Sequence, residues 1–150
     1  HVGRQHQPAI GIGTFGHGFT YSGHPVTTAI ALETLKVYED ENIAEHVRAI
    51  SPRFIERLRG FADRPLVAEV RGKGLIGGIE LMADKAARKP FDPVGKIGAQ
   101  LASLALEQGL IVRAMGDSIG FCPPLITTAA QIDEIFDKFD QALTRLEQTL

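Results

Sequence analysis

Two glycine-centred turns constrain this chain most, because each separates two short stretches rich in β-branched and other apolar residues. The turns are Gly72-Lys73-Gly74 and Gly116-Asp117. The four flanking stretches are residues 67–71, 75–81, 110–114 and 118–122. Short apolar runs bounded by turn residues predict strands, and a Gly-Asp pair between two of them predicts a tight hairpin. We therefore expect two pairs of strands.

Helical patterns surround these strand pairs. Apolar residues recur at helical spacing over residues 43–61, 97–105 and 132–146. Asn42 with Glu45, and Thr128 with Gln131, fit the capping box that opens a helix. Gly109 is suited to ending the second of these helices. Ser51-Pro52 interrupts the first, where we expect a kink or a brief break.

A further helix is expected over residues 26–38, with Pro25 in its first turn. Its residues are mostly Ala, Val, Ile, Leu and Thr. A helix that is apolar on most sides is usually buried. The element order is then helix, helix, two strands, helix, two strands, helix. This order predicts an α+β fold, a small and mostly antiparallel sheet covered by helices.

Composition excludes several classes of partner. The formal net charge is -2 and no Lys/Arg block stands out, which argues against a nucleic-acid or membrane-surface partner. No apolar run is long enough to cross a bilayer. Cys122 is the only cysteine, so no internal disulfide forms and a cytoplasmic location is expected. Cys122 itself is expected to be a small buried apolar residue.

The stretch Gly11-Ile12-Gly13-Thr14-Phe15-Gly16 matches the dinucleotide-binding fingerprint G-x-G-x-x-G. That fingerprint requires a strand before it and a helix that opens at its end. Polar residues precede it here and another loop follows, so we favour a plain glycine-rich loop. An NAD(P)-binding module remains a weaker alternative.

The loop His17–Pro25, HGFTYSGHP, gathers small and hydroxyl residues directly before the expected helix. Backbone N–H groups in such a loop, together with a Thr or Ser hydroxyl, can receive a phosphate. Ser22 or His24 could equally serve to cap the helix. His17 and His24 lack a third ligand at metal spacing, so no metal site is expected.

The loop HGFTYSGHP resembles the corresponding loop of class III aminotransferases, particularly the omega-amino acid–pyruvate type. VRGKGLIGGIEL and IVRAMGD, further along, are similar to the first strand pair and the arginine-bearing strand of that family's small domain. The resemblance covers nearly the whole chain. It implies a pyridoxal 5'-phosphate-dependent enzyme of fold type I, built as a homodimer, of which this chain is the C-terminal part.

The resemblance also implies roles for three residues. Phe19 and Thr20 would reach the cofactor phosphate of the partner subunit, and Arg113 would bind the substrate carboxylate. The residues themselves support Arg113, because a guanidinium in an apolar strand is partly desolvated and usually has an anionic partner. A structural salt bridge with Asp117 is the alternative.

The lysine that bonds to the cofactor is expected upstream of this chain. No lysine precedes the loop, and the first in the sequence is Lys36. The fragment therefore has no catalytic residue of its own and is expected to be inactive alone. The intact enzyme would move an amino group from an amine or amino acid to a keto acid, with pyruvate expected as acceptor.

The resemblance divides the chain into three segments. Residues 1–24 would be a loop segment from the large-domain side, residues 25–40 an interdomain helix, and residues 41–150 the small C-terminal domain. The chain lacks an initiator Met, and we expect an upstream part to be missing. A stand-alone α+β module that binds a small molecule or anion for regulation is the alternative function.

Overall fold

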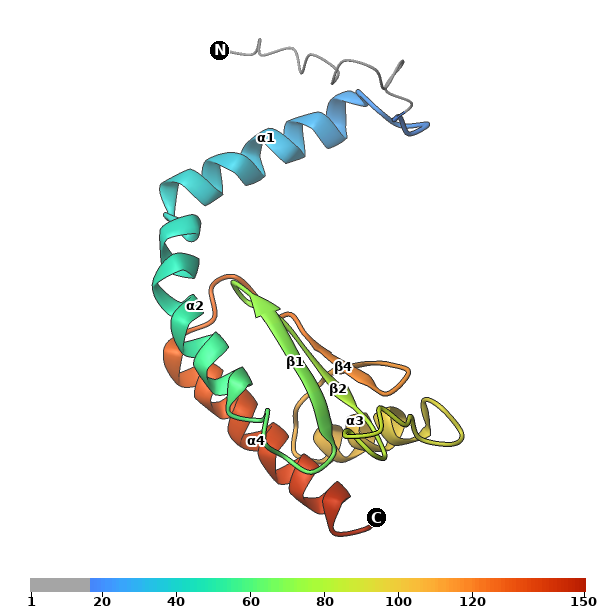
Figure 1. Ribbon diagram of the computed structural model, residues 1–150. Coiled ribbons are helices and arrows are strands. Elements are labelled where there is room, and N and C mark those ends of the chain that lie inside the picture. The colour runs from blue at the N-terminus through green and yellow to red at the C-terminus, as the bar shows by residue number, and fades with distance from the viewer. Residues whose placement is uncertain (1–16) are drawn as a thin grey trace, which may run out of the picture. The chain divides into compact units, whose positions relative to one another are not determined.

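The structure, a computed structural model, describes residues 17–150. The elements in chain order are α1 (Pro25–Asp40), α2 (Ile43–Arg59), β1 (Val67–Lys73), β2 (Ile76–Leu81), α3 (Lys96–Glu107), β3 (Arg113–Met115), β4 (Ser118–Phe121) and α4 (Ala129–Glu147) (Figure 1). The chain divides after Asp40 into two compact units.

The helix of the first unit, α1, begins at Pro25 as expected. Pro25 needs no hydrogen-bond partner there, because it lacks an N–H. The carbonyl of His24 accepts the N–H and the hydroxyl of Thr28 and the hydroxyl of Thr27. The predicted burial is not found among the described residues, where no residue of α1 is buried.

The second unit is built on one antiparallel sheet in the order β1-β2-β4-β3. β1 and β2 form the first predicted hairpin, with Lys73 paired to Ile76 across the turn Gly74–Leu75. β3 and β4 form the second, around Gly116-Asp117. Gly116 has φ +63°, a left-handed conformation that glycine adopts without strain. β2 and β4 join the two hairpins through Gly77–Glu80 and Ser118–Phe121.

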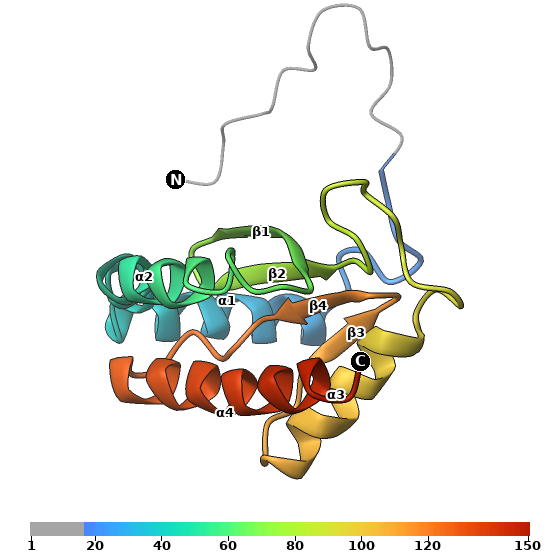
Figure 2. The same cartoon turned by 60° about the horizontal axis from the view of Figure 1, so that its bottom comes forward.

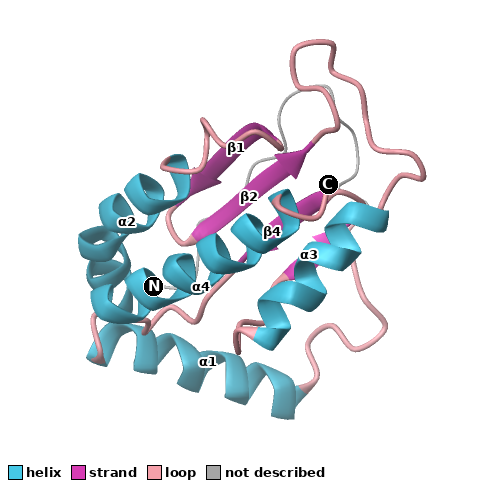
Figure 3. Cartoon of the chain, turned by 90° about the horizontal axis from the view of Figure 1, so that it is seen from below, coloured by secondary structure: helices cyan, strands magenta, loops and turns pink. Residues whose placement is uncertain are grey.

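Three helices cover one face of this sheet. Figure 3 shows α2, α4 and α3 in front of the strands, and Figure 2 shows α4 running along the sheet with α3 beside β3. Alternate residues of β2 and β4 point to this face, and Ile79 and Ile119 are fully buried there. The predicted α+β fold is thus confirmed.

Aromatic rings fill the layer between sheet and helices. The rings of Phe121 and Phe139 meet edge to face with centroids 4.9 Å apart. Phe136 contacts Phe54, Phe61 and Phe121. Edge-to-face and tilted aromatic pairs at this spacing add stability beyond the area they bury.

Two helix starts were predicted with the same motif and have different outcomes. At α4 the capping box is present, with the Thr128 hydroxyl accepting the Gln131 N–H. At α2 the prediction is wrong: Asn42 is left-handed, with φ 51° and ψ 38°, and its side chain makes no cap hydrogen bond. Glu45 pairs with Arg48 instead.

Helix α2 runs without a break from Ile43 to Arg59, so the expected break at Ser51-Pro52 is not found. The Ser51 hydroxyl donates to the carbonyl of Val47 inside the helix. Pro52 is therefore accommodated within one continuous element.

Arginines from α2 and from the turn after it meet acids of α4. Arg53 binds both carboxylate oxygens of Asp133, at 2.9 and 2.6 Å. Arg64 reaches Asp140 at 2.8 Å and Glu147 at 2.7 Å. The hydrogen bond from Arg53 lowers the pKa of Asp133 below its ordinary value of 3.8.

We expect Asp133→Asn to lower the melting temperature of the protein at pH 7, because it removes the charge that Arg53 binds. A carboxylate with a lowered pKa in the folded state stabilises that state above its unfolded pKa. This contribution is lost as the pH falls through the folded value. The difference in melting temperature between the two proteins should therefore begin to narrow below about pH 3.8 and should close once the pH is below the folded-state pKa of Asp133.

Asp63→Asn is the matched control, because Asp63 is exposed and has no ion pair among residues 17–150. Thermal unfolding followed by circular dichroism between pH 3 and pH 7 makes the comparison. An effect of Asp133→Asn that equals the control at pH 7, or that persists unchanged at the acid end, would contradict this assignment.

Candidate functional site

The loop before α1 is a tight turn whose ends are bonded to each other. The N–H of Phe19 donates to the Ser22 hydroxyl at 2.9 Å, and the N–H of Ser22 donates to the Phe19 carbonyl at 2.9 Å. The N–H of His24 donates to the Tyr21 carbonyl at 3.1 Å. Ser22 therefore closes the turn and does not cap α1. His24 lies directly before the helix, and its carbonyl accepts the Thr28 N–H.

Several donors of this turn remain available. The N–H and the hydroxyl of Thr20, and the N–H of Tyr21, have no hydrogen-bond partner within residues 17–150. All residues of the loop are exposed, and the side chains of Phe19 and Tyr21 retain 73% and 77% of their accessible surface. Unpaired N–H groups next to a hydroxyl are the kind of donors that can receive an anion.

This donor set fits a phosphate group by its chemistry. A phosphate oxygen accepts hydrogen bonds strongly, and the start of α1 follows the turn with its N-terminal N–H groups. Gly23 has φ +76°, which lets the chain turn from the loop into the helix. The turn therefore has donors that suit a phosphate ligand, and the roles of Phe19 and Thr20 stay predictions.

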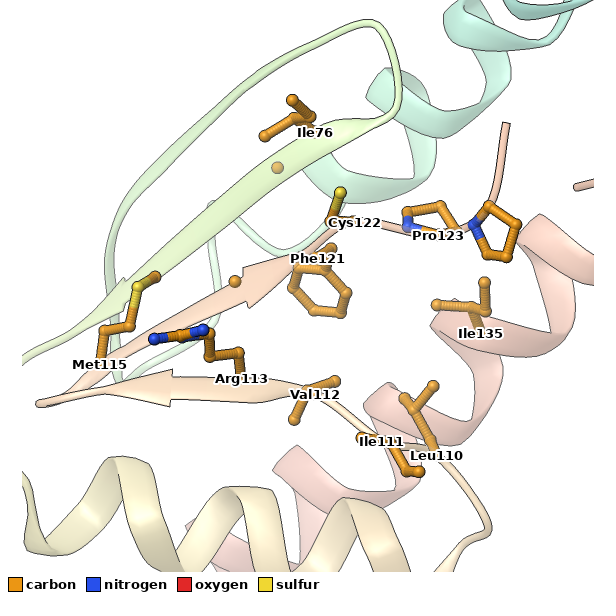
Figure 4. A pocket seen from close by; sticks show the side chains of 13 residues that line it. Ile76, Leu110, Ile111, Val112, Arg113, Met115, Phe121, Cys122, Pro123 and Ile135 are labelled. Atoms are coloured by element: carbon orange, nitrogen blue, oxygen red, sulfur yellow. The ribbon is translucent and has the colours of Figure 1, made fainter. Parts of the chain in front are cut away.

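A pocket of about 520 Å³ lies in the second unit, where β3 begins and β4 ends (Figure 4). Most of its lining is apolar, and Arg113 is the only permanently charged side chain in it. The other labelled lining residues are Ile76, Leu110, Ile111, Val112, Met115, Phe121, Cys122, Pro123 and Ile135. A concave apolar site with one placed polar group is the usual form of a small-molecule site.

Arg113 is the first residue of β3, and its side chain is exposed. The predicted partial desolvation is therefore not found within the second unit, because β3 is an edge strand and Arg113 lies on the sheet face opposite α2, α3 and α4. Within residues 17–150 the guanidinium has neither an ion pair nor a hydrogen bond. A fork of N–H donors beside an apolar wall can bind a carboxylate with two parallel hydrogen bonds.

The alternative ion pair between Arg113 and Asp117 is not formed. The carboxylate of Asp117 is buried and accepts the N–H groups of Gly95 and Gly98, at 2.7 and 2.8 Å. The sequence did not indicate this use of Asp117, because its partners lie in another element. In the sequence, the Gly-Asp turn motif is a sufficient reason for Asp117, and it gives no information on bonds to a distant element.

Cys122 is exposed, which corrects the expectation that it is buried. Phe121, the last residue of β4, points into the core, and Cys122, which follows the strand, is exposed. Among residues 17–150, no group of three His, Cys, Asp or Glu side chains is placed to hold a metal ion. The Gly11–Gly16 fingerprint lies outside the described residues.

Comparison with known proteins identifies the family. The family model for Aminotransferase class-III matches residues 1–143. The chain is 47% identical over 136 residues to gamma aminobutyrate transaminase 3, chloroplastic, of Solanum lycopersicum, covering 91% of this chain and 26% of that protein. It is 42% identical over 139 residues to the probable gamma-aminobutyrate transaminase 3, mitochondrial, of Oryza sativa subsp. indica, covering 93% of this chain and 27% of that protein.

The chain is also similar in fold and in sequence to a solved structure. The chain superposes on an omega transaminase from Pseudomonas jessenii with a TM-score of 0.81 and 45% identity, covering 91% of this chain and 30% of that one. The omega transaminase of this species has also been solved in complex with PMP. The chain thus spans between about a quarter and a third of the length of the proteins it matches. Both comparisons show that the chain belongs to the class III aminotransferases.

Proposed function

We propose that this chain is the C-terminal part of a transaminase that moves an amino group from an amine or amino acid to a keto acid, with pyruvate as acceptor. The observation that carries this proposal is Arg113, an unpaired guanidinium at the edge of an apolar pocket. Keto acids and amino acids share a carboxylate, which such an arginine binds. The apolar wall suits the remainder of a small substrate.

The family uses pyridoxal phosphate, which carries the amino group between the two substrates when it is bound. Thr20 would hold the cofactor phosphate with its hydroxyl and N–H, and Phe19 would lie beside it in the same turn. We propose that this loop serves the cofactor of the partner subunit in a homodimer. Arg113 would orient the substrate by its carboxylate.

We further propose the three segments expected from the sequence, with the phosphate loop in residues 1–24, an interdomain helix in residues 25–40 and the small domain in residues 41–150. Among residues 17–150, no helix combines the length and apolar character that crossing a bilayer requires. We propose a cytoplasmic protein with no nucleic-acid or membrane partner. Since its plant relatives are named as chloroplastic or mitochondrial, cell fractionation is the test.

Arg113→Ala in the intact enzyme should impair reaction with pyruvate far more than reaction with an amine that has no carboxylate. A hydrogen-bonded charge pair contributes about 1.5–3 kcal/mol. The value of kcat/KM for pyruvate should therefore fall about ten- to hundredfold. The two half-reactions, measured separately, give this comparison.

Arg71→Ala is the matched control. Arg71 lies in the same sheet, but it is paired with Glu69 and Glu80 and does not line the pocket. Its loss should leave both half-reactions nearly unchanged. An equal loss for pyruvate and for the amine in Arg113→Ala would refute the carboxylate-binding assignment.

Thr20→Val in the intact enzyme should weaken binding of pyridoxal phosphate about tenfold, because one hydrogen bond to a charged group is lost. Thr34→Val is its control, since the Thr34 hydroxyl donates to the Ile30 carbonyl within α1. Equilibrium dialysis of the cofactor measures both variants. Unchanged affinity in Thr20→Val would remove this residue from the phosphate site.

The 150-residue chain alone should be inactive and should form no borohydride-stable bond between pyridoxal phosphate and a lysine. No lysine lines the apolar pocket, and Lys36 lies on an exposed face of α1 beside Glu33. Mass spectrometry after borohydride treatment provides the measurement. A pyridoxyl group on one defined lysine would overturn the expectation.

A further inference from the structure

Asp117 is a buried carboxylate that joins two elements of the second unit. It retains only 9% of its accessible surface. One carboxylate oxygen accepts the Gly95 N–H at 2.7 Å and the other accepts the Gly98 N–H at 2.8 Å. These donors belong to the N-terminus of α3, whose own N-cap residue, Gly95, has no side chain. Asp117 therefore caps α3 from the β3–β4 turn, and its negative charge suits the positive end of the helix dipole.

The turn also makes close backbone contact with α3. A Cβ atom at Gly98 would lie 2.1 Å from the Gly116 carbonyl oxygen and 2.9 Å from the Cα of Asp117. Only a glycine at position 98 lets the turn approach the helix this closely. The Asp117 carbonyl accepts the Leu81 N–H at 2.9 Å, which attaches the same turn to the end of β2.

β3 depends on this attachment for its position. It has three residues, pairs with β4 alone, and forms an edge of the sheet. Its paired residues run from Arg113, opposite Gly120, to Met115, opposite Ser118. So short an edge strand has few bonds of its own, and the turn that follows Met115 determines where its end lies.

Figure 4 shows Arg113 and Met115 on the same side of β3, as the alternation of strand side chains requires. The Met115 methyl lies 3.1 Å from the position of a Cβ at Gly120, so Met115 lies across the residue that pairs with Arg113. A displaced turn would move Met115 first. Arg113, on the same side of β3, would then be displaced relative to the pocket.

We propose that Asp117 is a positioning residue: by capping α3 from the β3–β4 turn, it fixes the edge strand that presents Arg113 to the substrate carboxylate. This inference rests on the carboxylate-binding assignment of Arg113 in the proposed function. It assigns Asp117 no contact with substrate or cofactor. Its effect is transmitted through β3.

The test is Asp117→Asn in the intact enzyme loaded with pyridoxal phosphate. The amide keeps the shape and one acceptor oxygen, but its NH2 group faces a backbone N–H. We expect kcat/KM for pyruvate to fall about tenfold, since small misplacements of a binding group are costly. The half-reaction with benzylamine, which has no carboxylate, should change less than twofold. Hydrogen exchange should become faster in residues 95–99 and 113–118.

Glu107→Gln is the matched control, because it removes a carboxylate from the other end of α3, where Glu107 pairs with Arg145 on the surface. It should leave both half-reactions and the exchange of residues 113–118 unchanged. If Asp117→Asn does not fold, Asp117→Glu retains the charge and shifts it by one methylene, and it should produce the same selective loss.

A double-mutant cycle separates the possible outcomes. Asp117→Asn should have no further effect on pyruvate selectivity when Arg113 is already alanine. Equal losses for pyruvate and benzylamine, or lowered stability with unchanged selectivity, would overturn the positioning role and leave Asp117 purely structural. If Arg113→Ala itself shows no selectivity, the carboxylate-binding assignment fails, and faster exchange in Asp117→Asn would still report the attachment of the turn.

Discussion

One-sided burial of the antiparallel sheet organises the second unit. Side chains alternate along each strand, so Ile79 of β2 and Ile119 of β4 enter the core while their neighbours face away from it. The aromatic cluster and three helices occupy the covered side. The other side is covered by none of the helices α2, α3 and α4 and carries Arg113, Met115 and Gly120. The pattern that builds the core therefore also places the charged group at the pocket.

The covered side is aligned by ion pairs as well as by apolar contacts. Arg53 and Arg64 bind acids at opposite ends of α4, so that α2 and α4 are held along their length. Each pair is at least partly exposed and contributes modestly. Each pair also requires its two side chains to lie opposite one another, so the ion pairs favour one alignment of the two helices.

The sequence predicted those elements whose determinants are local. Gly116-Asp117 and Gly74 allow the turns, and Thr128 with Gln131 opens α4, because all the atoms involved lie within a few residues. The same capping motif failed at Asn42, where a left-handed backbone removes the side chain from the helix. The sequence specifies which donors and acceptors are present but not the backbone dihedral angles that orient them.

Long-range features could not be predicted in this way. Asp117 caps α3 across a separation of 19 residues to Gly98, and no spacing rule relates the two. The exposure of Cys122 and Arg113 depends on which sheet face the helices cover. For the candidate site, the resemblance supplied Phe19, Thr20 and Arg113, while the apolar wall of Ile76, Phe121 and Pro123 emerged only from the folded arrangement.

In the proposed function, the two candidate sites serve recognition rather than proton transfer. In the loop, the unpaired groups of Thr20 and Tyr21 are N–H and hydroxyl donors, which can bind an anion but are not bases at neutral pH. The pocket offers a guanidinium, which has N–H donors and no acceptor atom, and apolar walls. No Asp, Glu, His or Lys is among its lining residues. A phosphate and a carboxylate are the two anionic groups that a transaminase must hold in place, and Thr20 and Arg113 have the donors that each requires.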